Sequence, residues 1–360
     1  MARIDAFFKL MNDEGASDLH MISGQQPVLR IRGDMERVKY KAFQDEELKK
    51  MLYEICPEDK IKIYEETGDV DFGYEIAGMA RYRANFFRQK NGIGAVFREI
   101  PSDILTCDQL GLPKVISKLA MLPKGLVLVT GPTGSGKSTT LAAIVDEANK
   151  KRKDHILTIE DPIEFVHQSQ HCIVNHREVG THTMSFSAAL RGALREDPDI
   201  ILVGEMRDLE TFTLAMEAAM TGHLVFGTVH TLNAMKTVDR VVEIFPADQQ
   251  AQVRSTLADA LRAVVSQTLF KRIDVKGRVA ALEILICTPA VRNLIREGKT
   301  YQIPSAMQTG KKYGMQTLDD AILALLEKKQ ISAEDAYVNC TEKEKFAKFL
   351  KRPPADFTDA

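Results

Sequence analysis

The sequence has no tryptophan and only five cysteines in 360 residues. The cysteines are odd in number and far apart, which suits reduced, mostly structural thiols and provides no Cys-x-x-Cys zinc pair. No apolar run approaches the roughly 18 residues of a membrane-spanning helix. Charged residues interrupt the N-terminal apolar cluster that could otherwise serve as a signal core. We therefore expect a cytoplasmic protein.

An excess of charge of either sign is also missing. Lysine and arginine total 48, aspartate and glutamate total 50, and the formal net charge is -2. This balance gives no overall electrostatic case for binding nucleic acid or an anionic membrane. Hydrophobic residues make up 44% of the chain, which is ample for sizeable cores in about two or three domains. We expect a globular protein that binds no nucleic acid.

The first hundred residues have the pattern of a small α+β domain. Residues 4–11 carry apolar side chains at helical spacing, and two strand pairs follow. One pair has its turn at Gly33, and the other has a hairpin turn signal at Asn91. We assign residues 1–100 to this domain and the proline-containing residues 101–116 to a linker.

A different pattern begins after the linker. The apolar runs GLVLVTG, HILTIED, DIILVGE and HLVFGTV do not alternate, and each ends on a polar or glycine-rich corner. Helix-like sequence separates them, as in a buried parallel sheet with covering helices. We assign residues 117–290 to this α/β domain. Residues 291–360 are expected to form a helical region that ends in a frayed tail.

The first apolar run is followed by GPTGSGKST, which matches the phosphate-binding loop Gly-x-x-x-x-Gly-Lys-Ser and precedes a helix-like segment. Glycines let backbone N–H groups turn toward phosphate oxygens, and the helix N-terminus adds its dipole. Lys137 is expected to reach the β- and γ-phosphates, and Ser138 to offer a hydroxyl to Mg²⁺. The predicted nucleotide-binding residues here are Thr133, Gly134, Ser135, Gly136, Lys137, Ser138 and Thr139.

Acidic residues follow two of the later strands, and they favour hydrolysis. ATP is preferred over GTP because the nearest candidate for a guanine-reading Asn-Lys-x-Asp motif, residues 149–152, lacks the acid. Gly204 occupies a position where an aspartate often stands, which leaves Glu205 as the ligand of Mg²⁺ through water. Three more acids lie within residues 160–164, where an open α/β sheet binds ligands. Each could be a solvated loop acid, but three at the edge of a phosphate loop favour catalysis.

Histidines form two groups. His223 and His230 flank a strand-like run, and a strand would place them on opposite faces about 23 Å apart, so they do not share a metal. A structural role is favoured for His223. The second group could bind zinc, but an ordinary polar loop is favoured. Its members are His167, His171, Cys172, His176 and His182.

Seven stretches in order closely resemble the type II/IV secretion ATPases, and among these the retraction motors of type IV pili. They are SDLH, the phosphate loop, TIEDPIEF, DPDIILVGEMRD, TGHLVFGTVHT, VRNLIREGK and GMQTLDDA. The resemblance implies a PAS-like N-terminal domain, a RecA-like P-loop ATPase domain with C-terminal helices, and a homohexameric ring with ATP between the lobes. It implies that Glu164 acts as base on water, that Glu205 holds Mg²⁺ through water, and that His230 senses the γ-phosphate. It also implies docking on the inner-membrane platform protein of the pilus machine, so that the membrane is reached only through this partner.

Arginines could complete the site. Basic residues crowd the stretch RYRANFFRQKNGIGAVFRE, which could be a solvated sheet face or a nucleic-acid patch. The resemblance suggests instead that Arg83 and Arg98 meet nucleotide phosphates at the interface between the lobes. Arg195 and Arg207 could act within or across the ring, or could form a salt bridge with the acid that follows each of them.

The segment VRNLIREGK, residues 291–299, has an apolar stripe beside a basic one. The basic stripe could contact a partner, or its charges could simply face water.

The expected function is a hexameric ATP-hydrolysing motor that retracts type IV pili by depolymerising the filament. The nearest alternative is a pilus-extension or type II secretion ATPase, which usually carries an added N-terminal domain and a four-cysteine zinc motif that this sequence does not show. A RecA-like nucleic-acid motor is disfavoured by the near-neutral charge. A regulator that binds ATP without turnover is opposed by the acids after the two strands.

Overall fold

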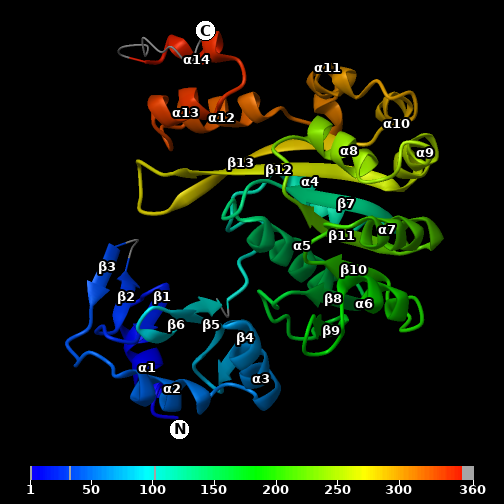
Figure 1. Cartoon of the computed structure of the whole chain (residues 1–360). Coiled ribbons are helices and arrows are strands. Elements are labelled where there is room, and N and C mark those ends of the chain that lie inside the picture. Colours follow the sequence, from blue (N-terminus) through cyan, green and yellow to red (C-terminus); the bar gives the residue numbers. More distant parts are fainter. Residues whose placement is uncertain (1, 32–33, 101–102, 351–360) are drawn as a thin grey trace. The chain divides into compact units, whose positions relative to one another are not determined.

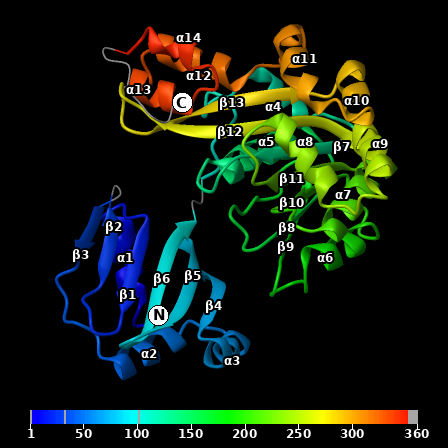
Figure 2. The ribbon, with the colours of Figure 1, turned by 45° about the horizontal axis from the view of Figure 1, so that its top comes forward.

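The computed structural model describes residues 2–31, 34–100 and 103–350. The chain divides into two compact units (Figures 1 and 2), Met1–Asp103 with Pro162–Val166, and Ile104–Asp161 with His167–Ala360. The positions of these parts relative to one another are not determined. The turn expected at Gly33, the first two residues of the expected linker and the expected frayed tail lie outside the described residues.

The first unit, as far as it is described, is an antiparallel sheet with the helices α1 to α3. Within the described residues its strand order is β3-β2-β1-β6-β5-β4. One face of β5 carries fully buried Tyr82, Ala84 and Phe86, because alternate residues of a strand point to one side. Phe8 of the opening helix stacks on Tyr82 with ring centroids 4.3 Å apart. The elements are α1 (Asp5–Asp13), β1 (Asp18–Ile22), β2 (Val28–Ile31), β3 (Asp34–Arg37), α2 (Asp45–Tyr53), α3 (Glu58–Thr67), β4 (Asp69–Ile76), β5 (Ala80–Gln89) and β6 (Gly92–Ile100).

The second unit is built on a sheet of order β13-β12-β7-β11-β10-β8-β9 within the described residues. All neighbouring strands are parallel except β13, which pairs with β12 in a long hairpin. The elements up to this hairpin are α4 (Lys114–Leu119), β7 (Gly125–Thr130), α5 (Lys137–Lys151), β8 (His155–Glu160), β9 (Ile173–Glu178), α6 (Phe186–Ala193), β10 (Ile200–Val203), α7 (Leu209–Thr221), β11 (Leu224–Val229), α8 (Ala234–Glu243), α9 (Gln250–Ala260), β12 (Leu261–Lys271) and β13 (Arg278–Ile286).

The four apolar runs of the sequence are β7, β8, β10 and β11, and they form the buried parallel centre of this sheet. Helices α4 and α5 pack on one face, and α6 to α9 pack on the other. The predicted fold class, an α+β unit followed by a covered parallel α/β sheet with C-terminal helices, is confirmed. Three strands of this sheet, β9, β12 and β13, were not predicted.

The last part of the described chain is helical. It contains α10 (Pro289–Arg296), α11 (Ile303–Thr309), α12 (Leu318–Glu327), α13 (Ala333–Asn339) and α14 (Lys343–Ala347). Helices α10 and α11 pack against the same hydrophobic core as α8 and α9. Helices α12 to α14 pack on the β12–β13 hairpin (Figure 2), where Phe270 shares a separate core with Ile322 and Phe346. Across the described ranges, no helix combines the length and the apolar character that spanning a membrane requires.

Candidate functional site

Four neighbouring strands of the second unit end at one edge of the sheet. Their order is β7-β11-β10-β8, and all four are parallel. Thr130 at the end of β7 pairs with Val229 at the end of β11, and Val203 at the end of β10 pairs with Ile159 of β8. The phosphate loop, His230, Glu205 and Glu160 follow or end these strands. They therefore share the edge at which open α/β sheets bind ligands.

The phosphate loop needs its glycines for shape. Gly131, Gly134 and Gly136 have φ angles of 142°, 78° and 86°, which side chains rarely allow. A Cβ on Gly131 would lie 2.4 Å from the backbone oxygen of Gln267, and one on Gly136 would lie 2.8 Å from its side-chain nitrogen. Strand β12 thus packs directly against the loop.

Helix α5 begins within the phosphate loop. Gly136 is its N-cap in the left-handed conformation and, as a glycine, has no side chain that could cap the helix. Its first N–H groups therefore suit an anion. The buried ammonium of Lys137 donates to the carbonyl oxygens of Gly131 (2.9 Å) and Pro132 (3.1 Å). Ser138, the next helical residue, is partly exposed.

Glu205 and His230, two of the predicted site residues, are in contact with each other. Nε2 of His230 lies 2.9 Å from the Glu205 carboxylate. The loop that carries Glu205 is fixed by the Thr228 hydroxyl, which donates to the carbonyl oxygen of Gly204 (2.5 Å). A Cβ on Gly204 would lie only 3.2 Å from the Cα of Glu160. Glycine at this position avoids a close contact between the chain after β10 and the end of β8. The acidic side chain follows one residue later, at Glu205.

Arg207 makes the second contact to Glu205. Its guanidinium donates to both carboxylate oxygens, at 2.5 and 2.6 Å. Burial alone would raise the pKa of Glu205, but the hydrogen bonds and charge of Arg207, together with the charges of His230 and Lys137, outweigh burial and lower it. Asp208 is not the partner of Arg207, because its carboxylate caps α7 through the backbone N–H of Thr211 (2.9 Å).

Arg195 also differs from the expected pairing. The carboxylate of Glu196 pairs with Arg177 at 2.7 Å. The Arg195 side chain is exposed on the loop that follows α6.

The remaining acids divide between the two units. Glu160 is buried at the end of β8, and its carboxylate lies 4.0 Å from Nδ1 of His176. Asp161 is exposed. Glu164 belongs to Pro162–Val166, which groups with the first unit. Because the two units are not placed relative to each other, its assignment as base stays a prediction.

The two arginines expected at the nucleotide phosphates belong to the first unit. Arg83 contacts Asp71 across β4 and β5 at 3.4 Å, and Arg98 contacts Asp18 across β1 and β6 at 2.8 Å. The Arg83 and Arg98 side chains remain 44% and 69% exposed, so both can still reach a further anion. Their role also stays a prediction.

His223 has a structural contact. Its Nδ1 lies 2.9 Å from the carbonyl oxygen of Ala218, and its backbone N–H donates to the same oxygen at 3.0 Å. This oxygen belongs to the last turn of α7. His223 therefore closes the C-terminus of that helix.

The second histidine group is held by hydrogen bonds. His176 lies between the Thr158 hydroxyl (2.7 Å) and the backbone N–H of His167 (3.1 Å). Burial lowers the pKa of His167 to about 4, which keeps it neutral. Within the described ranges, no group of three or more histidine, cysteine or acidic residues is arranged to hold a metal ion.

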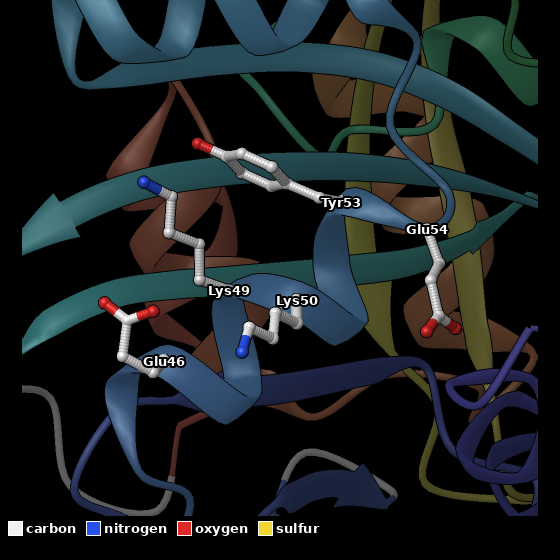
Figure 3. Close-up of a pocket in the computed structure, with 5 residues that line it drawn as sticks. All are labelled: Glu46, Lys49, Lys50, Tyr53 and Glu54. Carbon is white, nitrogen blue, oxygen red and sulfur yellow. The ribbon is translucent and has the colours of Figure 1, made fainter.

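A pocket of about 430 Å³ lies on α2 in the first unit. Figure 3 shows Lys49 beside Tyr53, with the ammonium 5.2 Å from the centre of the ring. The Tyr53 hydroxyl donates to Glu65 at 3.2 Å. These side chains contact one another, and none of the predicted site residues lines the pocket.

Gln267 in β12 was not singled out from the sequence. Its side chain is 3% exposed and bonds both to the phosphate loop and to α5. The available signal was the polar triplet Ser266–Thr268, which interrupts the apolar residues of AVVSQTLF.

Known proteins resemble the chain over nearly all of its length. A Pseudomonas aeruginosa protein described as type IV pilus retractation ATPase PilT is 56% identical over 323 residues, covering 90% of this chain and 94% of that protein. A twitching motility protein of Neisseria gonorrhoeae is 53% identical over 310 residues, covering 86% and 83%. The crystal structure of the pilus retraction motor PilT with bound ADP has a TM-score of 0.89 and 44% identity, covering 96% of this chain and 98% of that one.

The sequence profile of the type II/IV secretion system proteins matches residues 4–336. This chain therefore belongs to the family of type II/IV secretion system proteins.

Proposed function

We propose that this protein is an ATP-hydrolysing motor that powers the retraction of type IV pili. The observation that carries the proposal is the gathering of a complete phosphate loop, Glu205 and His230 at one sheet edge, in a chain closely similar to a pilus retraction ATPase. The relative named for twitching motility supports the same process.

The phosphate loop binds ATP through its backbone. Its positive-φ glycines allow N–H groups to face the phosphates, and the first turn of α5 adds the N–H groups of a helix N-terminus. Lys137 exchanges its contacts with the loop carbonyls for contacts with the β- and γ-phosphates.

The site also fits Mg²⁺. The Ser138 hydroxyl and the Glu205 carboxylate, the latter acting through water, are hard oxygen groups of the kind this ion prefers. The lowered pKa of Glu205 keeps its carboxylate charged for this task. When bound, Mg²⁺ neutralises phosphate charge.

Hydrolysis requires a base and a group that detects the γ-phosphate. Glu164 takes a proton from the attacking water, as its place in TIEDPIEF suggests. His230, 43% exposed and hydrogen-bonded to Glu205, is placed to exchange that bond for one to the γ-phosphate. Such an exchange would link nucleotide state to the strand that carries His230.

Assembly completes the proposal. The subunits form a homohexamer with ATP between the lobes, and Arg83 and Arg98 meet phosphates from the N-terminal side. The ring docks on the inner-membrane platform protein of the pilus machine, on its cytoplasmic side, and reaches the membrane only through that partner.

The test is complementation in Pseudomonas aeruginosa lacking its own PilT. The wild-type chain is expected to restore twitching, and Glu164→Gln at equal expression is not. Purified protein is assayed for phosphate release with and without single-stranded DNA, because strong stimulation by DNA would favour a nucleic-acid motor. If the purified protein hydrolyses ATP but the chain does not restore twitching, the proposed role in retraction is wrong and the proposed ATPase activity stands.

A further inference from the structure

Gln267 links three elements of the nucleotide site. It lies in β12 directly after Ser266, which pairs with Thr130 at the end of β7. Its side-chain nitrogen donates to the carbonyl oxygen of Ser135 in the phosphate loop at 2.7 Å. Its side-chain oxygen accepts from the Thr140 hydroxyl of α5, also at 2.7 Å. Both bonds are buried, so water does not compete for them.

The chemistry of these partners fixes which way the amide faces. A carbonyl oxygen only accepts, so the nitrogen of Gln267 must point at Ser135. The oxygen then faces the Thr140 hydroxyl, which can donate. Thr140 therefore holds the amide in the orientation that the loop requires.

The bond to Ser135 also orients the next N–H group of the loop. The peptide unit is planar and trans, so its C=O and N–H point in opposite directions. With the Ser135 carbonyl drawn toward β12, the N–H of Gly136 points away from β12. Gly136 is the N-cap of α5, next to Lys137, where a phosphate is expected.

We propose that Gln267 is a positioning residue for phosphate binding, which acts by holding the Ser135–Gly136 peptide with its N–H toward the nucleotide. Thr140 acts through Gln267 in the same way. The inference rests on the proposed function in one respect, since it requires that the loop bind a nucleotide.

The first variant is Gln267→Leu, which replaces the amide by an apolar group of similar size and removes both hydrogen bonds. Its matched control is Ser266→Ala, which removes a buried bond of the same strand, the one from the Thr130 hydroxyl at 2.8 Å. Thermal unfolding and ADP affinity are measured for both by calorimetry. Gln267→Leu is expected to weaken ADP binding about tenfold, and Ser266→Ala is expected to leave it unchanged.

A second pair of variants keeps the proposal testable if Gln267→Leu fails to fold. Thr140→Val removes the donor that orients the amide, and Thr140→Ser retains it. Thr140→Val is expected to weaken ADP binding about threefold, and Thr140→Ser to match the wild type.

Several outcomes would overturn the proposal. Equal ADP affinity in folded Gln267→Leu and wild type would do so, as would equal losses in Gln267→Leu and Ser266→Ala, or in Thr140→Val and Thr140→Ser. Failure of the wild type to bind ADP would instead contradict the proposed function.

Discussion

Arg207 and His230 both contact Glu205, and both lower the pKa of its carboxylate. Arg207 donates to both of its oxygens, and His230 lies 2.9 Å away. Burial opposes them by disfavouring the charged form. The balance between these effects sets the pH at which the acid loses its charge.

Arg207→Ala should therefore shift the pH dependence of ATP hydrolysis. Without the hydrogen bonds and charge of Arg207, less opposes the effect of burial, so the pKa of Glu205 rises and the carboxylate is protonated at a higher pH. The acidic limb of kcat/KM for ATP is expected to move upward by about one pH unit or less. Arg207→Lys, which keeps the charge, should move it less. An unchanged acidic limb in Arg207→Ala would show that Arg207 does not tune Glu205.

Substitutions at Lys137 and Glu164 should affect different steps, the first ATP binding and the second ATP turnover. Lys137→Ala removes a cation that contacts phosphates, and it should weaken ATP binding by about tenfold or more. Glu164→Gln keeps size and polarity but cannot accept a proton, so it should bind ATP normally and turn it over about a hundredfold more slowly. ATP titration and phosphate release measure the two effects. Wild-type turnover by Glu164→Gln would remove its assignment as base.

Some site residues were predictable because their signal is local. The phosphate loop is a fixed spacing of glycine and lysine, and Glu205 follows an apolar strand. Gln267 was missed because its role depends on β12 becoming the neighbour of β7, and the bonded pair Ser266 and Thr130 of these strands is 136 residues apart in the sequence. The partner of Arg207 was missed because Asp208 is taken by the cap of α7.

The strands also divide into those that the sequence predicts and those that it does not. Strands β7, β8, β10 and β11 were predicted because central strands of a parallel sheet are apolar on both faces. Strand β9 is an edge strand with the sequence IVNHRE, of which only the last residue is buried, so it lacks a continuous apolar run. Strand β12 directly follows α9, with no turn residue to mark where the helix ends.

Helix α10 has the two predicted stripes, with added detail. Val291 and Ile295 are fully buried, and Leu294 packs against the same core. Arg296 pairs with Asp259 of α9 at 2.5 Å, and Arg292 donates to the carbonyl oxygen of Cys287 at 3.1 Å. Part of the basic stripe thus serves contacts within the subunit.

Reversing charge at both Arg292 and Arg296 to glutamate should leave purified ATPase activity within about twofold of wild type, because surface ion pairs stabilise little. It should abolish pilus retraction in cells, if the basic stripe contacts a partner. Asp259→Arg combined with Arg296→Glu is the matched control, since it restores the pair with α9 but not the surface charge pattern. Normal retraction by the Arg292→Glu, Arg296→Glu variant at normal expression would show that this stripe does not couple hydrolysis to the pilus.

At the scale of the whole molecule, the proposed function requires residues of both units. The domain boundaries at residues 100, 116 and 290 stay predictions, as do the roles of Glu164, Arg83 and Arg98. The roles of these three residues could not be derived from sequence patterns, because contacts between lobes and subunits leave no periodic signal within one chain.

Assembly makes a further prediction. Turnover per subunit should fall on dilution below the concentration at which the proposed ring forms, because in that proposal each site requires the assembled ring. Arg83→Ala should lower activity about tenfold or more without unfolding, since its contact to Asp71 is exposed and adds little stability. Sedimentation beside the ATPase assay provides the check. A fully active monomer would exclude the ring.

The most direct measurement of the central claim is imaging of fluorescently labelled pili in the host of this protein. Cells carrying Lys137→Ala in place of the wild-type gene are compared with wild-type cells. We predict that the variant cells still assemble pili, that the pili persist, and that they no longer retract. Retraction at the wild-type rate in these cells, or the loss of pili from their surface, would contradict an ATP-driven retraction motor.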